Sequence, residues 1–444
     1  MRYIPNTPED REEMLKAIGV SGFNELIADI PKELLLKSPL NIPPALSELE
    51  LITELKALSE KNADTGRYAC FLGGGAYDHF IPSVVGHIAS RSEFSTSYTP
   101  YQAEVSQGTL QAAFEYQSMV CELTGMGVAN ASMYDGASAM AEAALMAQRV
   151  TKREVVAVSM AVHPNYRKVL RTYMQGIKSE VLSIPYTVDE GVSDLDALSA
   201  DISSDTACVI VQYPNFFGCI EDMAEAARLA HEKGALLVVV ADPIALGILK
   251  SPGELGADIV VGEGQGLGKS LSYGGPYLGI FACRDEHIRQ MPGRVVGETK
   301  DAKGRRGYVL TLQAREQHIK RERATSNICT NEALVALMAA VYMAAMGKHG
   351  MREVAELCLR KAHYALDELV KKPKVSRAFS APFFKEFVVK VDKGMGPVNA
   401  KLDNEKIIGG LDLGEHYPEL KGHVLIAVTE KRTKDEIDRF AGCF

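Results

Sequence analysis

The chain has 444 residues, of which 46% are hydrophobic and 24% charged, and its formal net charge is −8. This size and apolar content suffice for a large core and predict two domains, while the acidic balance argues against a nucleic-acid partner. The eight cysteines lack CxxC or metal-ligand spacing, and most lie in apolar runs. We therefore expect reduced, buried thiols in a cytoplasmic protein, and no metal site.

The first stretch, MRYIPNTPEDREEM, has neither the apolar core of a signal peptide nor an Arg- and Ser-rich presequence, so neither export nor organelle import is predicted. The longest uncharged apolar run, residues 333–347, is shorter than the roughly 18 to 20 residues of a membrane-spanning helix. A buried helix in a soluble protein is the expectation, with no membrane partner.

Residues 1–63 are predicted to form a helical N-terminal arm. Thr7 and Asp10 have the spacing of a capping box, and Gly19 suits the end of the helix that follows. Residues 46–61 repeat apolar side chains at intervals of three and four, which predicts a helix with one packed face. Such an arm either wraps a partner subunit or packs on its own domain.

Two glycine- and tyrosine-containing loops follow. Residues 71–80, FLGGGAYDHF, lack GxGxxG spacing and a P-loop lysine, so a turn near an interface is favoured over a phosphate cradle. In residues 97–108, Tyr98 and Tyr101 flank a Thr-Pro turn and Gln102 follows, before Ser106 as the candidate cap of a long helix. Phenol and amide groups suit either a small polar ligand or a subunit contact.

Residues 128–149 predict a short strand, an N-cap at Asp135 and an Ala-rich helix. The bare N–H group of Gly136 at this helix start is typical of an anion site for a cofactor phosphate. Because Asp135 would repel a phosphate, simple capping is the favoured interpretation.

Strand-like runs at 155–160, 180–184, 208–213 and 235–242 alternate with helical segments. This pattern predicts a mainly parallel sheet covered by helices on both sides, in a large α/β domain over residues 64–330. Residues 276–283 follow the preceding strand without a helix and are expected to run antiparallel. His163, after the first of these strands, either stacks on a cofactor ring or, the slightly favoured alternative, begins the helix at Pro164.

Asp242 ends the run 235–242 and is therefore expected at the edge of the sheet where ligands bind. A pyridoxal-phosphate enzyme needs a carboxylate there for the ring nitrogen, although Asp242 also suits a cap before Pro243. The next run ends near Gln265, where such an enzyme needs its Schiff-base lysine, and an amide forms no imine. Lys269 is the alternative amine, but its glycine neighbour predicts that it faces solvent.

Residues 284–330 are loop-rich and basic, and their mixed charges, which include Arg315 and Glu316, predict a solvated ion-pair face or an anion contact across an interface. Residues 331–444 predict a smaller α+β domain. Its predicted helices are at 332–346 and 351–369, its strands at 384–391 and 423–430, and its last helix starts near residue 434.

Several stretches closely resemble the P-protein of the glycine cleavage system, glycine dehydrogenase (decarboxylating), and specifically subunit 1, its N-terminal half. They are YTPYQAEVSQG (98–108), VANAS (128–132), GEGQ (262–265), SYGGPYLG (272–279) and LTLQAREQHIKRERATSNICTNEA (310–333). The resemblance extends over nearly the whole chain. It implies the type I fold of pyridoxal-phosphate transferases and an α2β2 tetramer with glycine dehydrogenase subunit 2.

The resemblance also implies an activity of that complex: it decarboxylates glycine and transfers the aminomethyl group to the lipoyl arm of H-protein. Pyridoxal phosphate would be bound covalently by the partner subunit, with none bound covalently to this chain. The expected degenerate cofactor site comprises Gln265, Asp242, His163 and Gly136. The side chains expected to line the partner's pocket are Tyr98, Tyr101 and Gln102. The alternatives are a self-sufficient pyridoxal-phosphate decarboxylase that uses Lys269, and a purely structural scaffold.

Overall fold

The computed structural model describes residues 5–392 and 394–444. By their internal contacts, residues 1–62 and residues 63–444 are two separate units. Residues 63–444 behave as one compact unit, so the further division predicted at residue 330 stays a prediction.

The first unit consists of short helices whose apolar side chains stay exposed. α1 (Pro8–Ile18) begins with the predicted capping box of Thr7 and Asp10 and ends at Gly19, and α3 (Glu48–Ser59) begins with a second capping box. α2 (Phe23–Leu26) and a 3-10 turn (Lys32–Leu34) lie between them. α1, α2 and α3 contain no buried residue in the described part of the chain, so the caps and not a core define these helices.

The second unit is built on a sheet of seven strands among the described residues, in the order β2-β8-β7-β6-β5-β3-β4. Its strands are β2 (Val128–Ala129), β3 (Val155–Ser159), β4 (Val181–Ile184), β5 (Thr206–Tyr213), β6 (Leu236–Ala241), β7 (Ile259–Glu263) and β8 (Gly279–Cys283). The five from β7 to β4 are parallel, while β8 and β2 are antiparallel to their neighbours. This arrangement confirms the predicted sheet and the antiparallel run near residue 280.

Both faces of this sheet are buried, which explains why its strands are almost continuously apolar. Along β6, Val238 and Val240 join one core cluster, whereas Leu237 and Val239 join the other. Helices α7 (Gly136–Thr151) and α8 (Pro164–Ile177) pack on the first face. The opposite face is covered by α6 (Gln107–Thr124), α9 (Leu195–Asp201), α10 (Met223–Glu232) and the beginning of α12 (Ala333–Val370).

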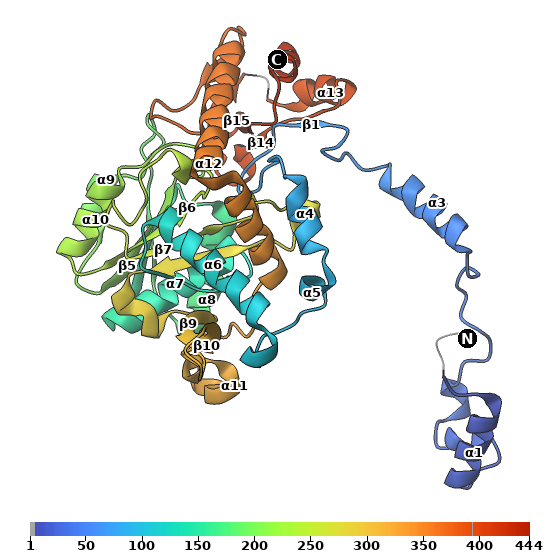
Figure 1. The fold of residues 1–444 in the computed structure, drawn as a ribbon. Helices are drawn as coiled ribbons and strands as arrows, with labels where there is room; N and C mark the ends of the chain where they lie inside the picture. The colour runs from blue at the N-terminus through green and yellow to red at the C-terminus, as the bar shows by residue number, and fades with distance from the viewer. Residues whose placement is uncertain (1–4, 393) are drawn as a thin grey trace. The chain divides into compact units, whose positions relative to one another are not determined.

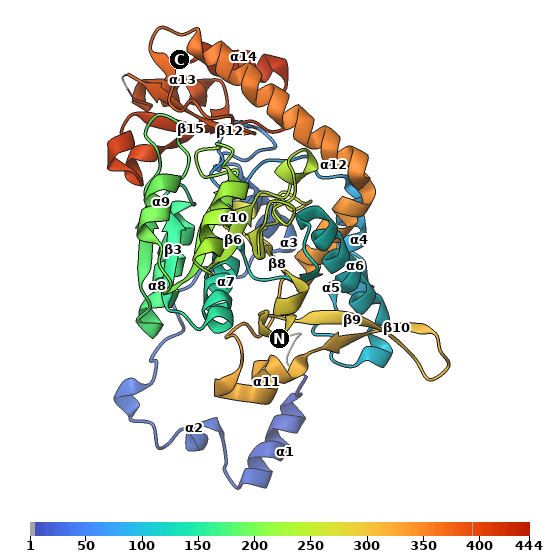
Figure 2. The same cartoon turned by 90° about the vertical axis from the view of Figure 1, so that its left-hand side faces the viewer.

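A second sheet, antiparallel and of four strands in the described residues, lies near the C-terminus in the order β11-β12-β15-β14. Its strands are β11 (Val375–Arg377), β12 (Glu386–Val391), β14 (Leu411–Asp412) and β15 (His423–Ala427). β1 (Ala69–Cys70) pairs in parallel with β13 (Ile407–Ile408). Helices α13 (Gly396–Asn404) and α14 (Lys434–Gly442) share the core of this sheet (Figure 2).

Helix α12 connects the two sheets (Figure 1). It joins the two helices predicted at 332–346 and 351–369, with a kink at Gly347, where φ is 57°. In the described part of the chain, α12 is the one helix long and apolar enough to cross a membrane, which length and composition alone would allow. Its Ala339 and Cys358 belong to the core under the seven-stranded sheet, and its Ala362 and Leu369 to the C-terminal core. We therefore interpret its apolar composition as core packing.

Residues 284–330 are more regular than predicted. β9 (Val295–Lys300) and β10 (Arg306–Thr311) form an antiparallel hairpin, with α11 (Gln317–Lys320) beyond it (Figure 2). The prediction of a solvated ion-pair face is wrong for Arg315 and Glu316, which are both buried. Arg315 donates to the carbonyls of Met291 and Gly293, so its charge is used to hold backbone. Helices α4 (Ser83–Ala89) and α5 (Ser92–Ser95) complete the unit.

Candidate functional site

A small pocket, here called the edge pocket, lies at the carboxyl ends of the parallel strands. Parallel strands end at one edge of the sheet, so residues that follow different strands meet there. His163 comes from the end of β3, Asp242 from the end of β6 and Glu263 from the end of β7. The pocket is lined by Gly75, Tyr77, His163, Tyr166, Gln212, Val240, Ala241, Asp242, Pro243, Glu263, Gly266 and Lys385.

Gln265 lies beside the edge pocket and is 1% exposed. Its Oε1 accepts a hydrogen bond from the Tyr77 N–H at 2.8 Å, and its Nε2 donates to the Tyr77 carbonyl at 3.0 Å and to the Lys269 carbonyl at 2.7 Å. The amide thus ties the glycine loop, residues 71–80, to the turn after β7. A lysine ammonium has no acceptor atom for the Tyr77 N–H, so this position now suits an amide.

Asp242 is held by two groups of its own chain. Its Oδ1 accepts from the Ile244 N–H at 3.0 Å, and its Oδ2 lies 2.7 Å from the Nζ atom of Lys385. The side chain of Lys385, just before β12, is 2% exposed, and its Nζ lies 3.5 Å from the centre of the Tyr77 ring. The carboxylate at the end of β6 therefore faces a buried ammonium group.

The start of α7 differs from the expected open anion site. The Gly136 N–H donates to Glu263 Oε2 at 3.1 Å, and Glu263 Oε1 accepts from the N–H groups of Gln265 at 3.0 Å and Leu278 at 2.9 Å. The expectation of a bare N–H at Gly136 is therefore wrong, because a side chain of the same chain uses it. Asp135 caps the helix through the Ser138 N–H at 2.7 Å, as predicted.

His163 begins α8, which confirms the favoured interpretation of its position. Its Nδ1 accepts from the Asn165 N–H at 3.1 Å, so the proton is on Nε2, which lies 2.7 Å from the Gly74 carbonyl. Its ring stacks on Tyr166 with centroids 4.7 Å apart and also contacts Phe216. Burial lowers the pKa of His163 to about 4 and keeps the ring neutral.

Burial also raises the pKa values of two carboxyl groups in this region. Desolvation raises the pKa of Glu263 to about 8 and that of Glu386 to about 7, in spite of the N–H groups that favour the charged forms. Glu386 accepts from the Gly74 N–H and from the Tyr77 hydroxyl, both at 2.7 Å. Glu386 therefore links the glycine loop to β12.

Lys269, the alternative Schiff-base candidate, lies on the turn after Gln265. Its Nζ donates to Ser272 Oγ at 3.1 Å, and its backbone carbonyl accepts from Gln265. Lys385, and not Lys269, is the lysine found in the lining of the edge pocket.

Pyridoxal phosphate needs a lysine, a carboxylate for its ring nitrogen and a helix start for its phosphate. In the edge pocket Gln265 is bound to backbone, Asp242 is paired with Lys385, and the N–H of Gly136 is used by Glu263. The residues present do not fit pyridoxal phosphate.

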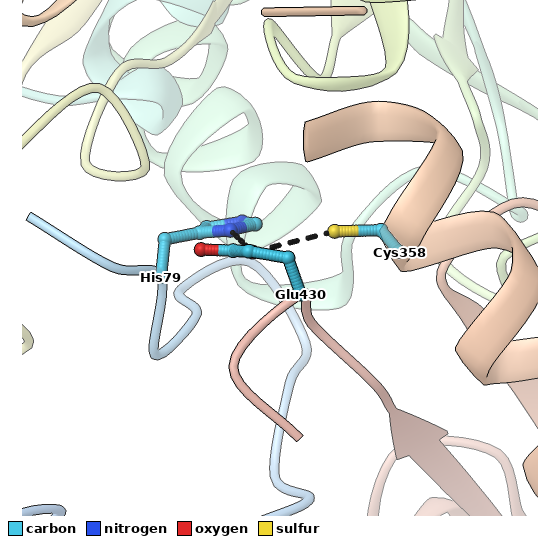
Figure 3. Close-up of side chains that lie close together, drawn as sticks. All are labelled: His79, Cys358 and Glu430. Carbon is cyan, nitrogen blue, oxygen red and sulfur yellow. Dashed lines mark hydrogen bonds and ion pairs between the residues drawn. The ribbon is translucent and has the colours of Figure 1, made fainter. Parts of the chain in front are cut away.

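Three possible metal ligands, His79, Cys358 and Glu430, lie close together, as Figure 3 shows. Glu430 Oε2 lies 2.6 Å from His79 Nδ1 and 3.4 Å from the Cys358 sulfur, and Lys385 Nζ lies 3.2 Å from His79 Nε2. An ammonium only donates, so the imidazole proton lies on Nδ1, the atom that would have to bind a metal. We therefore interpret the cluster as a hydrogen-bonded chain that continues from Asp242.

The loop of residues 97–108 lies at a different pocket, here called the loop cleft. Tyr98 is 85% exposed and Tyr101 53% exposed, and Gln102 is also exposed. The guanidinium group of Arg294 packs on the Tyr101 ring, with its central carbon 5.6 Å from the ring centre. The loop cleft and the edge pocket share no lining residue, so the structure keeps the two sets of candidate residues apart.

The base of this loop is held in a way that the sequence did not predict. Ser106 makes no side-chain cap at the start of α6. Instead, the amide of Gln107 donates to the carbonyls of Ala103 and Tyr308 at 2.8 and 2.9 Å and accepts from the Tyr308 N–H at 2.9 Å. The loop is thereby fixed to the β9–β10 hairpin.

Sequence reasoning missed Lys385, Glu386, Glu263, Tyr77 and Tyr166. A signal for the first two existed, because a Lys-Glu pair interrupts the apolar residues of FKEFVVKV (384–391) at positions expected to be buried. Glu263 is likewise an acid at the end of a buried strand, like Asp242. The backbone partners of these side chains depend on how the glycine loop packs. Hydrophobic periodicity in the sequence does not predict such packing.

The family described as glycine cleavage system P-protein matches residues 1–444. The chain is 57% identical over 441 residues to a protein of Desulforamulus reducens named probable glycine dehydrogenase (decarboxylating) subunit 1, covering 99% of this chain and 98% of that one. A protein of Geobacillus kaustophilus with the same name is 57% identical over 439 residues, covering 99% and 97%.

Solved structures give the same result. A crystal structure of glycine decarboxylase (P-protein) in inhibitor-bound form has a TM-score of 0.90 and 43% identity, and the match covers 100% of this chain and 99% of that one. Sphingosine-1-phosphate lyase of Burkholderia pseudomallei shares the fold alone, with a TM-score of 0.65, 16% identity and 93% of each chain covered. The fold is that of type I pyridoxal-phosphate transferases, and the chain belongs to the P-protein family of the glycine cleavage system.

Proposed function

We propose that this chain is the subunit of a heteromeric P-protein that completes the active site of its partner and binds no cofactor covalently itself. The observation that carries the proposal is the state of the edge pocket. Gln265 stands where the family fold would need its lysine, and Lys385 is ion-paired with Asp242. An ammonium held by a carboxylate is a poor nucleophile, since Schiff-base formation requires a neutral amine.

The proposed partner is glycine dehydrogenase subunit 2, in an α2β2 tetramer in the cytoplasm. The complex decarboxylates glycine and transfers the aminomethyl group to the lipoyl arm of H-protein. Pyridoxal phosphate would be held by a lysine of subunit 2 and would supply the electron sink for the decarboxylation.

In this proposal the residues Tyr98, Tyr101 and Gln102 face the partner's pocket. Their exposure leaves two phenol hydroxyls and an amide available to a substrate or to the lipoyl sulfur. Arg294 contacts the Tyr101 ring and Gln107 holds the loop to β10, so the loop is fixed before a partner arrives. A fixed loop costs little conformational entropy on assembly, which suits a positioning role.

The first unit supports the same proposal. Four apolar side chains on one face of α3 are 47–56% exposed: Leu51, Ile52, Leu55 and Leu58. A contiguous apolar helix face of this kind is typical of a protein interface. We expect this arm to cover the partner subunit, and not to remain in water.

Reconstitution tests the proposal. The purified chain, purified subunit 2 and their mixture are each assayed for CO2 release from glycine in the presence of lipoylated H-protein and pyridoxal phosphate. We expect turnover only in the mixture, with full activity retained when Lys269 is changed to Ala. Turnover by the chain alone, lost in Lys269→Ala, would establish the self-sufficient enzyme instead. Full turnover by subunit 2 alone would reduce this chain to a scaffold.

A further inference from the structure

The edge pocket contains a built-in cation on Asp242, the carboxylate that the ring nitrogen of the cofactor would need as its partner. Lys385 Nζ lies 2.7 Å from Asp242 Oδ2 and 3.2 Å from His79 Nε2, and it is packed against the Tyr77 ring. Its side chain is 2% exposed and that of Asp242 15%. A buried carboxylate that already has a cation does not need a protonated pyridine as a second one.

The pocket also contains a carboxyl group at the start of α7, where a cofactor phosphate would need free N–H groups. Glu263 accepts from three backbone N–H groups, those of Gly136, Gln265 and Leu278. Tyr166 lies beside the same helix start, since a Cβ atom added to Gly136 would lie 2.4 Å from its hydroxyl oxygen. A phosphate that used these N–H groups would have to displace Glu263.

We propose that Lys385 and Glu263 exclude pyridoxal phosphate from this subunit independently of Gln265. The pair replaces the two charged ends of the cofactor with side chains of the chain itself. Loss of the lysine at position 265 is then one of three changes that keep the cofactor out. This inference rests on the fold of the chain and not on the partner with which it assembles.

The consequence is that restoring the lysine alone does not restore the site. In Gln265→Lys the new amine would find the carbonyls of Tyr77 and Lys269, which the native amide already uses. Asp242 would still be neutralised by Lys385, and the N–H of Gly136 would still be occupied. Opening the pocket requires the removal of Lys385 and Glu263 as well.

The test uses the full chain, incubated with pyridoxal phosphate over a range of concentrations, reduced with borohydride and digested for mass spectrometry. The variants are Gln265→Lys, the double variants with Lys385→Met or Lys385→Arg added, and the triple variant Gln265→Lys/Lys385→Met/Glu263→Ala. Lys385→Arg is the matched control, since it keeps a cation on Asp242. The native chain gives the background label. Thermal unfolding of each variant shows whether it is folded.

We expect no pyridoxyl label at position 265 above background in Gln265→Lys or in its Lys385→Arg double variant. The triple variant takes the label at position 265, at a level at least 10-fold above that background. Equal labelling of Gln265→Lys and the triple variant would overturn the proposal, as would a folded triple variant without label. If the triple variant does not fold, the Lys385→Met and Lys385→Arg double variants decide, and equal labelling of those two, or none in either, overturns it.

Discussion

Gln265 pairs with Tyr77 through both backbone groups of that residue, as one strand residue pairs with another: its amide oxygen accepts from the Tyr77 N–H at 2.8 Å and its amide nitrogen donates to the Tyr77 carbonyl at 3.0 Å. Position 265 therefore has a structural role of its own. The glutamine holds the glycine loop over the edge of the sheet, where Tyr77 contacts Lys385 and Glu386.

The first prediction concerns this pair. Gln265→Leu keeps a similar volume but leaves the N–H of Tyr77 without a partner and removes one donor from each of the carbonyls of Tyr77 and Lys269. We therefore expect the free energy of unfolding to fall by about 3 kcal/mol. Urea unfolding of the purified chain measures this. Gln175→Leu, at an exposed position of α8, is the control and should change the value by about 0.5 kcal/mol at most. Equal stability of the two variants would show that the pairing contributes nothing.

The second prediction concerns pH. Burial raises the folded-state pKa of Glu386 from 4.5 to about 7, so its contribution to stability is complete below the unfolded value and is lost as the pH rises through about 7. Glu386→Gln removes this titration. Each unit of pKa difference corresponds to about 1.4 kcal/mol.

We therefore expect the stability of Glu386→Gln relative to the native chain to increase by about 2 kcal/mol between pH 5 and pH 8. Urea unfolding of both proteins at the two pH values gives this difference. Burial also raises the pKa of Glu263 to about 8 and that of Glu221 to about 7, but these two groups titrate in both proteins and their effects largely cancel. A difference that stays constant with pH would contradict the assignment to Glu386.

The third prediction concerns the exposed face of α3. Changing Ile52 and Leu55 to Ser should leave the thermal midpoint of the isolated chain unchanged, because neither side chain is buried. If the arm covers the partner, loss of two apolar contacts should weaken assembly with subunit 2 by about 100-fold, as sedimentation would show. Glu54→Ser on the same helix is the control. Native affinity in the double variant would remove the arm from the interface.

The fourth prediction concerns the loop of residues 97–108. Tyr98→Phe and Tyr101→Phe each remove one hydroxyl without changing the ring, and we expect turnover of the assembled complex to fall by about 10-fold, the effect of one hydrogen bond. Steady-state CO2 release measures this, with Tyr364→Phe as the control, since its hydroxyl donates to Asp438 on another helix. Unchanged turnover in both loop variants would place the loop outside the active site.

The sequence predicted the sheet because its buried strands are continuous apolar runs, and it predicted the caps at Thr7 and Asp135 because capping is local. The sequence did not predict contacts between segments that are far apart in the chain. The contact of Lys385 with Asp242 joins residues 143 positions apart, counted as 385 − 242, and the burial of Arg315 depends on carbonyls of residues 291 and 293. The β9–β10 hairpin was missed because its charged residues hide the alternation of Tyr308 and Leu310.

The central claim is that this subunit acts without a cofactor of its own, and the most direct measurement is the position of the cofactor in the assembled complex. The active complex is reduced with borohydride and digested, and the pyridoxyl group is located by mass spectrometry. We predict the label on a lysine of subunit 2 alone. A stoichiometric label on this chain, at Lys269, Lys385 or any other lysine, would contradict the account.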